Sequence, residues 1–197
     1  MSELPRIYLA RHGETAWTIS RQHTGRTDLP LTDGGRQEAE HVRERLADRC
    51  QGWDYCPMPE HVFSSPLKRA KETCEIATRS QQIELWDDLM EWDYGDYEGL
   101  KTCDILKTNP GWNIFKDGSP GGESIADVEA RADRVVARLR EISEPEAFVF
   151  SHGHFLRVVM ARWLKQPVSS GAFFVLSTAA VVVLGYEHNL DEPCIRF

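Results

Sequence analysis

Residues 7–15 carry the sequence Ile-Tyr-Leu-Ala-Arg-His-Gly-Glu-Thr, and this stretch decides the predicted fold. A short apolar run that ends in charged residues and glycine is typical of a buried strand. Such a strand would present Arg11 and His12 at its carboxyl end. Gly13 would let the backbone approach a ligand closely, because glycine has no Cβ. Arg11 and His12 thus offer a cation and a nucleophile at one strand end.

The rest of the chain alternates between predicted strands and helices. Short apolar runs predict strands over residues 61–63, 147–151, 172–177 and 179–186, the last two joined by a tight turn. Apolar periodicity predicts helices over residues 33–50 and 124–142. A proline at the first turn predicts a helix over residues 66–79, and an apolar composition predicts one after 154 as far as 164. This alternation indicates an α/β fold. We expect a three-layer sandwich with a mostly parallel central sheet and helices on both faces.

The length of 197 residues favours a single domain over residues 1–197. Hydrophobic residues make up 41% of the chain and charged residues 27%, a composition typical of a globular protein with a real core. The segment 86–123 differs from the rest, because it is rich in Trp, Tyr, Gly and Pro and has weak periodicity. We expect it to be an insertion that lies over a pocket at the carboxyl ends of the strands.

Charge and cysteine content narrow the class of protein. The formal net charge of −8 argues against a nucleic-acid or membrane partner, since both need basic patches. An anionic substrate would need a locally positive pocket. The five cysteines are scattered without a CxxC pair, which argues against a disulfide framework and against a structural metal site. We expect reduced thiols in a cytoplasmic protein with no cofactor, and the sequence leaves open whether it forms a homo-oligomer.

The residue types at the strand ends suit the hydrolysis of a phosphate monoester without a metal. Arginine can pair bidentately with phosphate oxygens. A neutral histidine can attack phosphorus and leave again. A carboxylic acid, kept protonated by a nearby anionic phosphate, can protonate the leaving oxygen. Candidates for these roles beyond the first strand are Arg69, His152 with Gly153, and Glu91. Taken singly, each has an ordinary structural explanation, and the carboxylates around Glu91 are rivals for its role.

The combination of motifs resembles the histidine phosphatase superfamily, also called the phosphoglycerate-mutase-like family. The resemblance covers most of the chain and keeps the family order, through residues 8–15, 24–32, 64–70 with Thr73, Glu91 with 94–99, 121–124 and 151–154. Within the superfamily, the sequence looks most like fungal sedoheptulose-1,7-bisphosphatase. That narrower likeness lies in residues 91–99, 110–118 and 188–193.

The resemblance implies roles for individual residues. His12 would take the phosphoryl group as a phosphohistidine, and Arg11, Arg69 and His152 would surround its non-bridging oxygens. Glu91 would protonate the leaving oxygen and then deprotonate the attacking water. The resemblance implies further phosphate contacts from Thr24, Gly25 and Gly153. It also suggests substrate contacts from Trp17, Thr18, Tyr94, Lys101, Lys116 and His154, with the two lysines facing a second phosphate. Trp92 and Trp112 are further candidates for the wall of a sugar-sized pocket; these aromatic residues would otherwise pack the insertion onto the sheet.

The expected activity is that of a metal-independent phosphomonoesterase acting on a small phosphorylated metabolite, a sugar phosphate or bisphosphate. Thr18 stands where family mutases tend to have Asn, and His152-Gly153-His154 is a form associated with phosphatases. The chain is also shorter than typical mutases and shorter than the fungal bisphosphatase. The alternatives are mutase-type phosphoryl transfer, a phosphoprotein phosphatase and a non-catalytic binding protein on the same fold.

Overall fold

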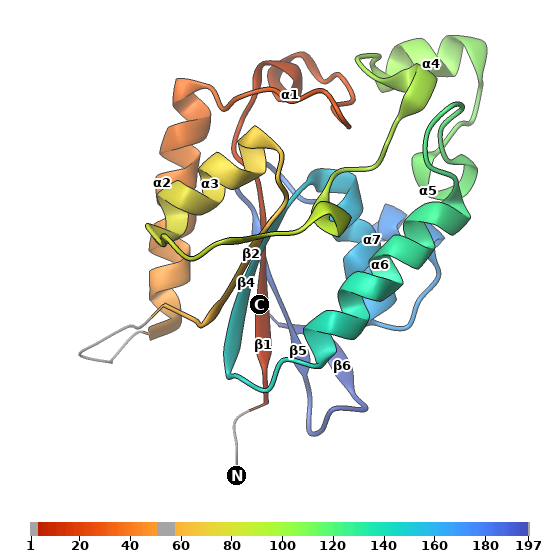
Figure 1. Ribbon diagram of the computed structural model, residues 1–197. Helices are drawn as coiled ribbons and strands as arrows, with labels where there is room; N and C mark the ends of the chain where they lie inside the picture. The colour runs from red at the N-terminus through yellow and green to blue at the C-terminus, as the bar shows by residue number, and fades with distance from the viewer. Residues whose placement is uncertain (1–3, 51–57, 197) are drawn as a thin grey trace.

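The computed structural model describes residues 4–50 and 58–196, in which a central sheet separates two layers of helices (Figure 1). The described strands form one sheet in the order β3-β2-β4-β1-β5-β6. Their bounds are β1 Arg6–Arg11, β2 His61–Ser64, β3 Glu84–Leu85, β4 Glu146–Ser151, β5 Val181–Tyr186 and β6 Pro193–Arg196. β3, β2, β4 and β1 run parallel, whereas β5 and β6 are antiparallel to their neighbours. The predicted three-layer α/β fold is confirmed.

The register of the two central strands brings the sequence motifs together. β1 pairs with β4 from Arg6 opposite Glu146 to Arg11 opposite Ser151. The His12 backbone N–H then donates to the Ser151 carbonyl at 3.0 Å, so the residues that follow both strands are neighbours. Parallel strands end at the same edge of a sheet, which is why His12 and His152 meet there.

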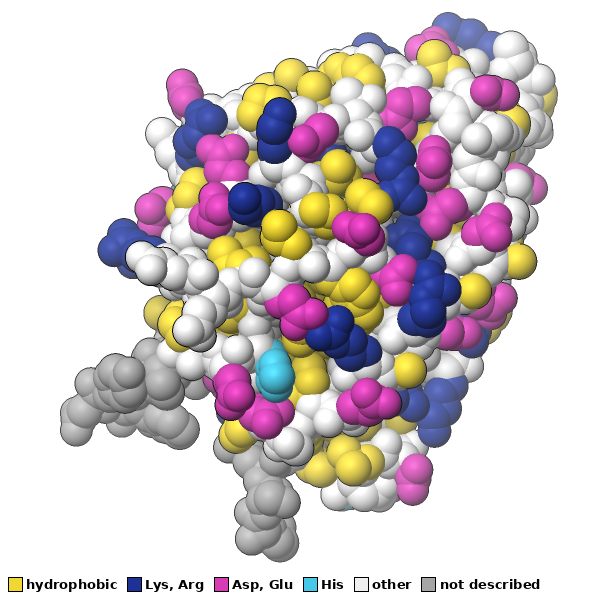
Figure 2. Space-filling view, in the orientation of Figure 1, with side chains coloured by type: hydrophobic (Ala, Val, Ile, Leu, Met, Phe, Trp, Pro, Cys, Tyr) yellow, Lys and Arg dark blue, Asp and Glu magenta, His cyan; other side chains and the backbone are white. Residues whose placement is uncertain are grey.

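Helices cover both faces of the sheet because its central strands are apolar on both sides. α2 (Asp33–Ala47) and α3 (Lys68–Thr78) lie on one face, and α6 (Ile125–Arg140) and α7 (Gly153–Trp163) on the other (Figure 1). β1 alternates between them: Ile7 and Leu9 pack in the core under α6 and α7, and Tyr8 and Ala10 in the core under α2 and α3. Lys, Arg, Asp and Glu side chains are interspersed over the face shown in Figure 2.

Short elements fill the connections. Their bounds are α1 Ala16–Ser20, η1 Asp48–Cys50, η2 Asp87–Leu89, η3 Gly95–Tyr97, α4 Thr102–Thr108, α5 Ile114–Asp117 and η4 Val168–Phe173. The segment 86–123 thus contains η2, η3, α4 and α5, and its side chains reach the core. Trp92, Ile105, Trp112 and Phe115 are all buried in the same apolar cluster as α6 and α7.

One predicted strand pair is wrong. Residues 172–177 form no strand, because η4 and an irregular stretch occupy this region. The carbonyls of Gly171 and Ala172 accept hydrogen bonds from Arg157 on α7 instead of pairing in a sheet. A Cβ on Gly171 would lie 2.7 Å from the Phe115 ring, so η4 packs tightly against α5. β5 pairs with β1 and with β6, a strand that the apolar pattern did not reveal.

Candidate active site

The described residues form a pocket of about 190 Å³ beyond the carboxyl ends of β1 and β4. Three arginines line it although the net charge of the chain is −8. The lining residues are Arg11, His12, Thr18, Arg21, Gln22, His23, Thr24, Glu91, Tyr94, Gly153, His154, Arg157 and Leu176. The rings of His12 and His152 lie 5.2 Å apart, centroid to centroid.

The tautomer of His12 follows from its hydrogen bond. Its Nδ1 lies 2.7 Å from the Gly13 carbonyl oxygen. A carbonyl only accepts, so Nδ1 carries the hydrogen and the neutral ring keeps a lone pair on Nε2. Burial, followed by the charges of Arg69 and Arg11, holds the pKa of His12 well below its usual range. His12 is therefore a neutral imidazole with a free nucleophilic nitrogen.

The loop after His12 is fixed by backbone contacts. The Gly13 N–H donates to Thr73 Oγ1 at 3.0 Å, and that hydroxyl donates to the Arg69 carbonyl at 2.7 Å. A Cβ on Gly13 would lie 2.4 Å from the carbonyl oxygen of Gly35, near the start of α2. Only glycine fits this approach. The loop that follows His12 is therefore held against both α2 and α3.

Arg69 and His152 lie behind the residues that line the pocket, and neither side chain has exposed surface. Arg69 Nε donates to His152 Nδ1 at 3.1 Å, and the other His152 nitrogen, Nε2, lies 2.8 Å from Ser65 Oγ. Because Nδ1 accepts, the neutral ring carries its hydrogen on Nε2 and donates it to Ser65. The Arg69 Nη atoms donate to the carbonyls of Thr24, Gly25 and Thr27.

Arg11 reaches the pocket itself. Its Nη1 donates to the Leu176 carbonyl at 2.5 Å, while its buried Nε has no hydrogen-bond partner among the described residues. A Cβ on Gly153 would lie 3.1 Å from Arg11 Nε, so the glycine makes room for the guanidinium. Burial lowers the pKa of Arg11, and the nearby Glu91 carboxylate opposes that effect. An unpaired buried donor on a charged group suits an anionic ligand.

Glu91 caps the first turn of α7. Its Oε1 accepts from the backbone N–H groups of Trp92 at 2.9 Å and Phe155 at 2.8 Å, and its Oε2 accepts from His154 N–H at 3.0 Å. The N-terminus of a helix favours a carboxylate because its N–H groups lack intrahelical acceptors. These bonds fix a carboxyl group in the pocket wall close to the strand end that carries His12.

The sequence matches the family model of the histidine phosphatase superfamily (branch 1) over residues 7–192. The chain belongs to the histidine phosphatase superfamily. It is 41% identical over 191 residues to an acid phosphatase of Mycobacterium tuberculosis, covering 96% of this chain and 91% of the relative. It is 32% identical over 226 residues to the sedoheptulose 1,7-bisphosphatase of Saccharomyces cerevisiae, covering 96% and 83% respectively.

A solved structure from Mycobacterium tuberculosis has the same fold, with a TM-score of 0.89 and 37% identity over 98% of this chain and 96% of that one. The expected family and its phosphatase activity are therefore confirmed: this histidine phosphatase is a phosphoric monoester hydrolase.

An aromatic cluster forms one wall of the phosphatase pocket. Tyr94 Oη contacts His154 Nδ1, and the His23 ring lies 4.8 Å from Tyr94 and 5.8 Å from His154. Burial holds the pKa of His154 well below its usual range and lowers that of His23. Both histidines are therefore neutral near pH 7. They add rings and hydrogen-bonding groups to this wall rather than positive charge.

The structure places only some of the predicted substrate contacts at the pocket. Thr18, Thr24, Tyr94, Gly153 and His154 line it. Residues that do not line it are Trp17, which packs on Gly99; Gly25, whose N–H donates to Glu98; and the exposed Lys101 and Lys116. Trp92 packs in the core, and Trp112 lines a second cavity that shares His23, His154 and Arg157 with the first.

Two cations of the pocket were missed by sequence reasoning. Arg21 ends α1 in the left-handed conformation, with φ of 62°, and is exposed. Arg157 lies on α7, where it donates to Gly171 and stacks 4.4 Å from the Phe115 ring centroid. A single arginine in a loop or a helix carries no motif. Position in the folded chain is the only signal for either residue.

Other predictions concern cysteines, metals and membranes. Cys74, Cys103 and Cys194 are free thiols, whereas Cys56 and the side chain of Cys50 lie outside the described residues. Within residues 4–50 and 58–196, no group of three His, Cys, Asp or Glu side chains is arranged to hold a metal ion. No helix in the described part of the chain is long and apolar enough to cross a membrane.

Proposed function

We propose that this phosphatase hydrolyses a small phosphorylated metabolite through a phosphohistidine on His12. The observation that carries the proposal is the hydrogen bond from Nδ1 to the Gly13 carbonyl, which leaves the lone pair on Nε2. Nε2 attacks phosphorus, the ester P–O bond breaks, and the leaving oxygen receives a proton. Water then attacks the phosphohistidine, loses a proton, breaks the P–N bond and releases inorganic phosphate.

Arg11 is the group that contacts the phosphoryl oxygens in this proposal. Its unpaired Nε and its position in the pocket support the role. Arg69 and His152 lie behind the lining in the present arrangement. Arg69 nevertheless contributes to the low pKa of His12, so its charge acts at the nucleophile. We propose that Arg69 and His152 stabilise the phosphoryl charge from this second layer.

Glu91 is the proton carrier of the proposed mechanism. Its protonated carboxyl would give a proton to the leaving oxygen, and the carboxylate would then take one from the attacking water. Its fixed place at the start of α7, next to Arg11 and Gly153 in the pocket lining, supports this assignment over the carboxylates around it. Asp87, Asp88, Asp93 and Glu98 do not line the pocket.

The proposed substrate class is a sugar phosphate or bisphosphate. A pocket of about 190 Å³ suits a small molecule, and the name of the yeast relative points the same way. Arg21 and Arg157 provide positive charge in addition to that of Arg11. We propose that these two arginines, rather than the lysines expected from the sequence, bind the second anionic group, because they line the pocket and the lysines do not.

The segment 86–123 belongs, in our proposal, to the same single domain as the sheet and forms part of the pocket wall. Two observations support this organisation. Glu91 and Tyr94 line the pocket, and Trp92, Ile105 and Phe115 are buried in the core cluster shared with α6 and α7.

The test is a screen of phosphorylated metabolites in the presence of EDTA, with His12→Ala as the control. It includes sedoheptulose and fructose bisphosphates, phosphoglycerates and a phosphoprotein. We expect EDTA-resistant release of inorganic phosphate that falls about a thousandfold or more in His12→Ala. Activity that survives His12→Ala, or that EDTA abolishes, contradicts the mechanism. Preference for the phosphoprotein contradicts the substrate class only. Transfer of phosphate to a second metabolite in place of water indicates a mutase.

A further inference from the structure

Arg131 on α6 is a buried cation that does not line the pocket, yet it binds the segment that carries Glu91. Only 6% of its surface is exposed. Its Nη1 donates to the carbonyls of Asp88 at 2.9 Å and Met90 at 2.6 Å, and its Nη2 lies 3.4 Å from the Glu91 carbonyl. The Arg131 guanidinium therefore contacts three backbone carbonyls, two just before Glu91 and that of Glu91 itself.

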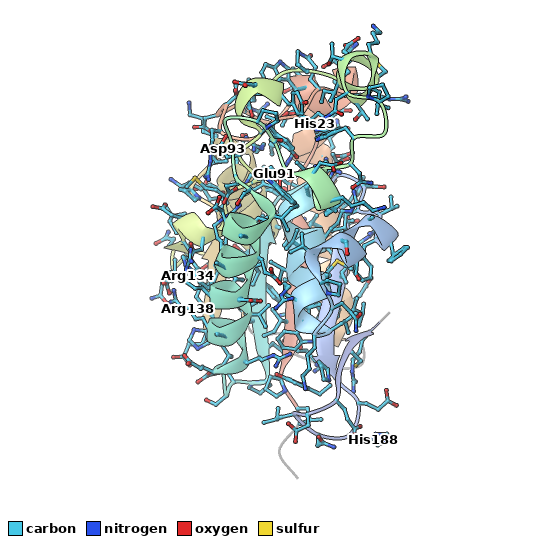
Figure 3. All side chains as sticks on the ribbon, turned by 90° about the vertical axis from the view of Figure 1, so that its right-hand side faces the viewer. His23, Glu91, Asp93, Arg134, Arg138 and His188 are labelled. Atoms are coloured by element: carbon cyan, nitrogen blue, oxygen red, sulfur yellow. The ribbon has the colours of Figure 1, made fainter. Side chains whose placement is uncertain are left out.

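Glu123 holds the other side of the same segment. It forms a bidentate pair with Arg131, with both N–O distances 2.7 Å. Its Oε2 also accepts from the Asp93 N–H at 2.9 Å, and its carbonyl accepts from Trp92 Nε1 at 3.0 Å. The Arg131–Glu123 pair thus contacts the chain on both sides of Glu91. Figure 3 shows Glu91 and Asp93 near one end of α6.

Arg131 also reaches the group that binds the Glu91 carboxylate. Its guanidinium carbon lies 3.9 Å from the centroid of the Phe155 ring. The backbone N–H of Phe155 donates to Glu91 Oε1 at 2.8 Å. Arg131 therefore packs against both the chain that carries Glu91 and the helix turn that fixes its carboxylate.

We propose that Arg131 and Glu123 are positioning residues that hold the Glu91 carboxyl in place for proton transfer to the leaving group. This inference rests on the proposed role of Glu91. Neither residue lines the pocket, so both act through Glu91 and not on the substrate. Proton transfer needs hydrogen-bond distance, and a displacement of about 1 Å costs about a hundredfold in rate.

The geometry requires arginine at this position. A guanidinium presents several donors in one plane, so it serves the carboxylate of Glu123 and the backbone carbonyls together. An ammonium group keeps the charge but is a single point with three donors. Arg131→Lys should therefore loosen the segment around Glu91 without removing the buried positive charge.

The experiment compares kcat/KM for two esters, p-nitrophenyl phosphate and glycerol 2-phosphate, in the whole protein. The nitrophenolate leaves without a proton, whereas the alkoxide needs one. We expect Arg131→Lys to lower kcat/KM for glycerol 2-phosphate about tenfold to a hundredfold and for p-nitrophenyl phosphate less than about threefold. Because both substrates meet the same enzyme sample, loss of folded protein lowers both values equally and leaves their ratio unchanged.

The matched control is Arg134→Lys, the same chemical change three residues further along α6. Arg134 is exposed and pairs with the Asp88 carboxylate at 2.7 and 3.0 Å, so it touches the same segment but not the Glu91 backbone. The ratio of the two kcat/KM values should stay at the wild-type level. If Arg131→Lys does not fold, Glu123→Gln serves instead, because it keeps the side-chain shape but weakens the pair; it should change the ratio in the same direction.

Glu91→Gln separates failure of this inference from failure of the proposed function. It should lower the glycerol 2-phosphate value about a hundredfold or more relative to the nitrophenyl ester. If Glu91→Gln changes the ratio and neither Arg131→Lys nor Glu123→Gln does, the positioning role is overturned and the role of Glu91 stands. If Glu91→Gln lowers both values equally, the proton-donor role fails and the inference fails with it.

Discussion

The inner and outer ends of the pocket are built in different ways. The inner end, formed by His12 with Gly13, Arg69 and His152 packed behind it, comes from strand ends and α3. Its side chains are buried, and protein groups fix the orientation of both rings. The outer end, formed by Arg21, Gln22, His23, Tyr94 and Arg157, comes from loops, the segment 86–123 and α7. There, the Arg21 guanidinium is exposed and has no protein partner within the described residues.

This difference suits the two ends of the pocket to different roles in the proposed reaction. A buried group held by several hydrogen bonds cannot adjust to a new ligand without leaving polar atoms unsatisfied. An exposed arginine at the end of a short helix can be replaced at little cost to folding. The inner end therefore suits the proposed attack on phosphorus, and the outer end suits the proposed contacts with the rest of the substrate.

Replacement of Arg69 gives the largest expected effect and tests the inner end. Arg69→Met removes the donors to His152 and to the carbonyls of Thr24, Gly25 and Thr27. Each buried acceptor left unpaired costs about 1–3 kcal/mol, so we expect the free energy of unfolding to fall by at least about 3 kcal/mol. Urea unfolding measures it.

Lys71→Met on the same helix is the control, because Lys71 is exposed and its ion pair with Glu75 spans 3.7 Å at the surface. It should change the free energy of unfolding by less than about 1 kcal/mol. Equal losses in the two variants would show that the inner end is not held as the hydrogen bonds indicate.

The buried histidines predict an intermediate effect on the pH dependence of stability. The pKa values of His12, His152 and His154 are held well below the usual range in the folded chain, burial being the main cause. The unfolded chain takes up these protons below about pH 6.5, whereas the folded chain does not. The contribution of these three neutral histidines to the free energy of unfolding is therefore complete above about pH 6.5. The free energy of unfolding falls as the pH drops below about 6.5 towards the pKa values of the folded chain.

Urea unfolding between about pH 5 and 7.5 checks this dependence. His12→Gln should make the loss of stability at acid pH smaller. His188→Gln should not make this loss smaller. His188 is exposed at the opposite end of the molecule from Glu91 (Figure 3), and hydrogen bonding to Glu192 raises its pKa. An unchanged acid dependence in His12→Gln would contradict a neutral buried His12.

The smallest expected effect belongs to the outer end. Arg21→Ala should lower kcat/KM for a sugar bisphosphate about fivefold to tenfold. This factor corresponds to a free energy of about 1 kcal/mol, which is typical of one charge pair near the surface. It should change the value for a monophosphate less. Lys116→Ala, outside the pocket, should change neither. If Lys116→Ala lowers kcat/KM for the bisphosphate more than Arg21→Ala does, the sequence-based expectation that lysines contact a second phosphate holds after all.

Local pattern explains how far the sequence predicted the fold. β1, β4 and α6 were found to within a few residues, because buried strands and amphipathic helices show their environment in their own composition. The irregular region at 172–177 was mistaken for a strand because its apolar residues resemble one. Phe173 is in fact 85% and Val175 86% exposed. The short strand β6 carries a proline and a cysteine and has no such pattern.

The sequence by itself determined the family, the meeting of the parallel strands at one edge of the sheet, and Arg11, His12 and Glu91 as candidates for the pocket there. These inferences depend on short motifs in the sequence. Only the tertiary structure decided which nitrogen of His12 is free, that Arg69 lies behind the pocket, and that Arg21 and Arg157 line it. It also decided that Arg131 reaches Glu91. These features depend on contacts between residues far apart in the chain, and no local pattern encodes the direction of a hydrogen bond or the depth of a side chain.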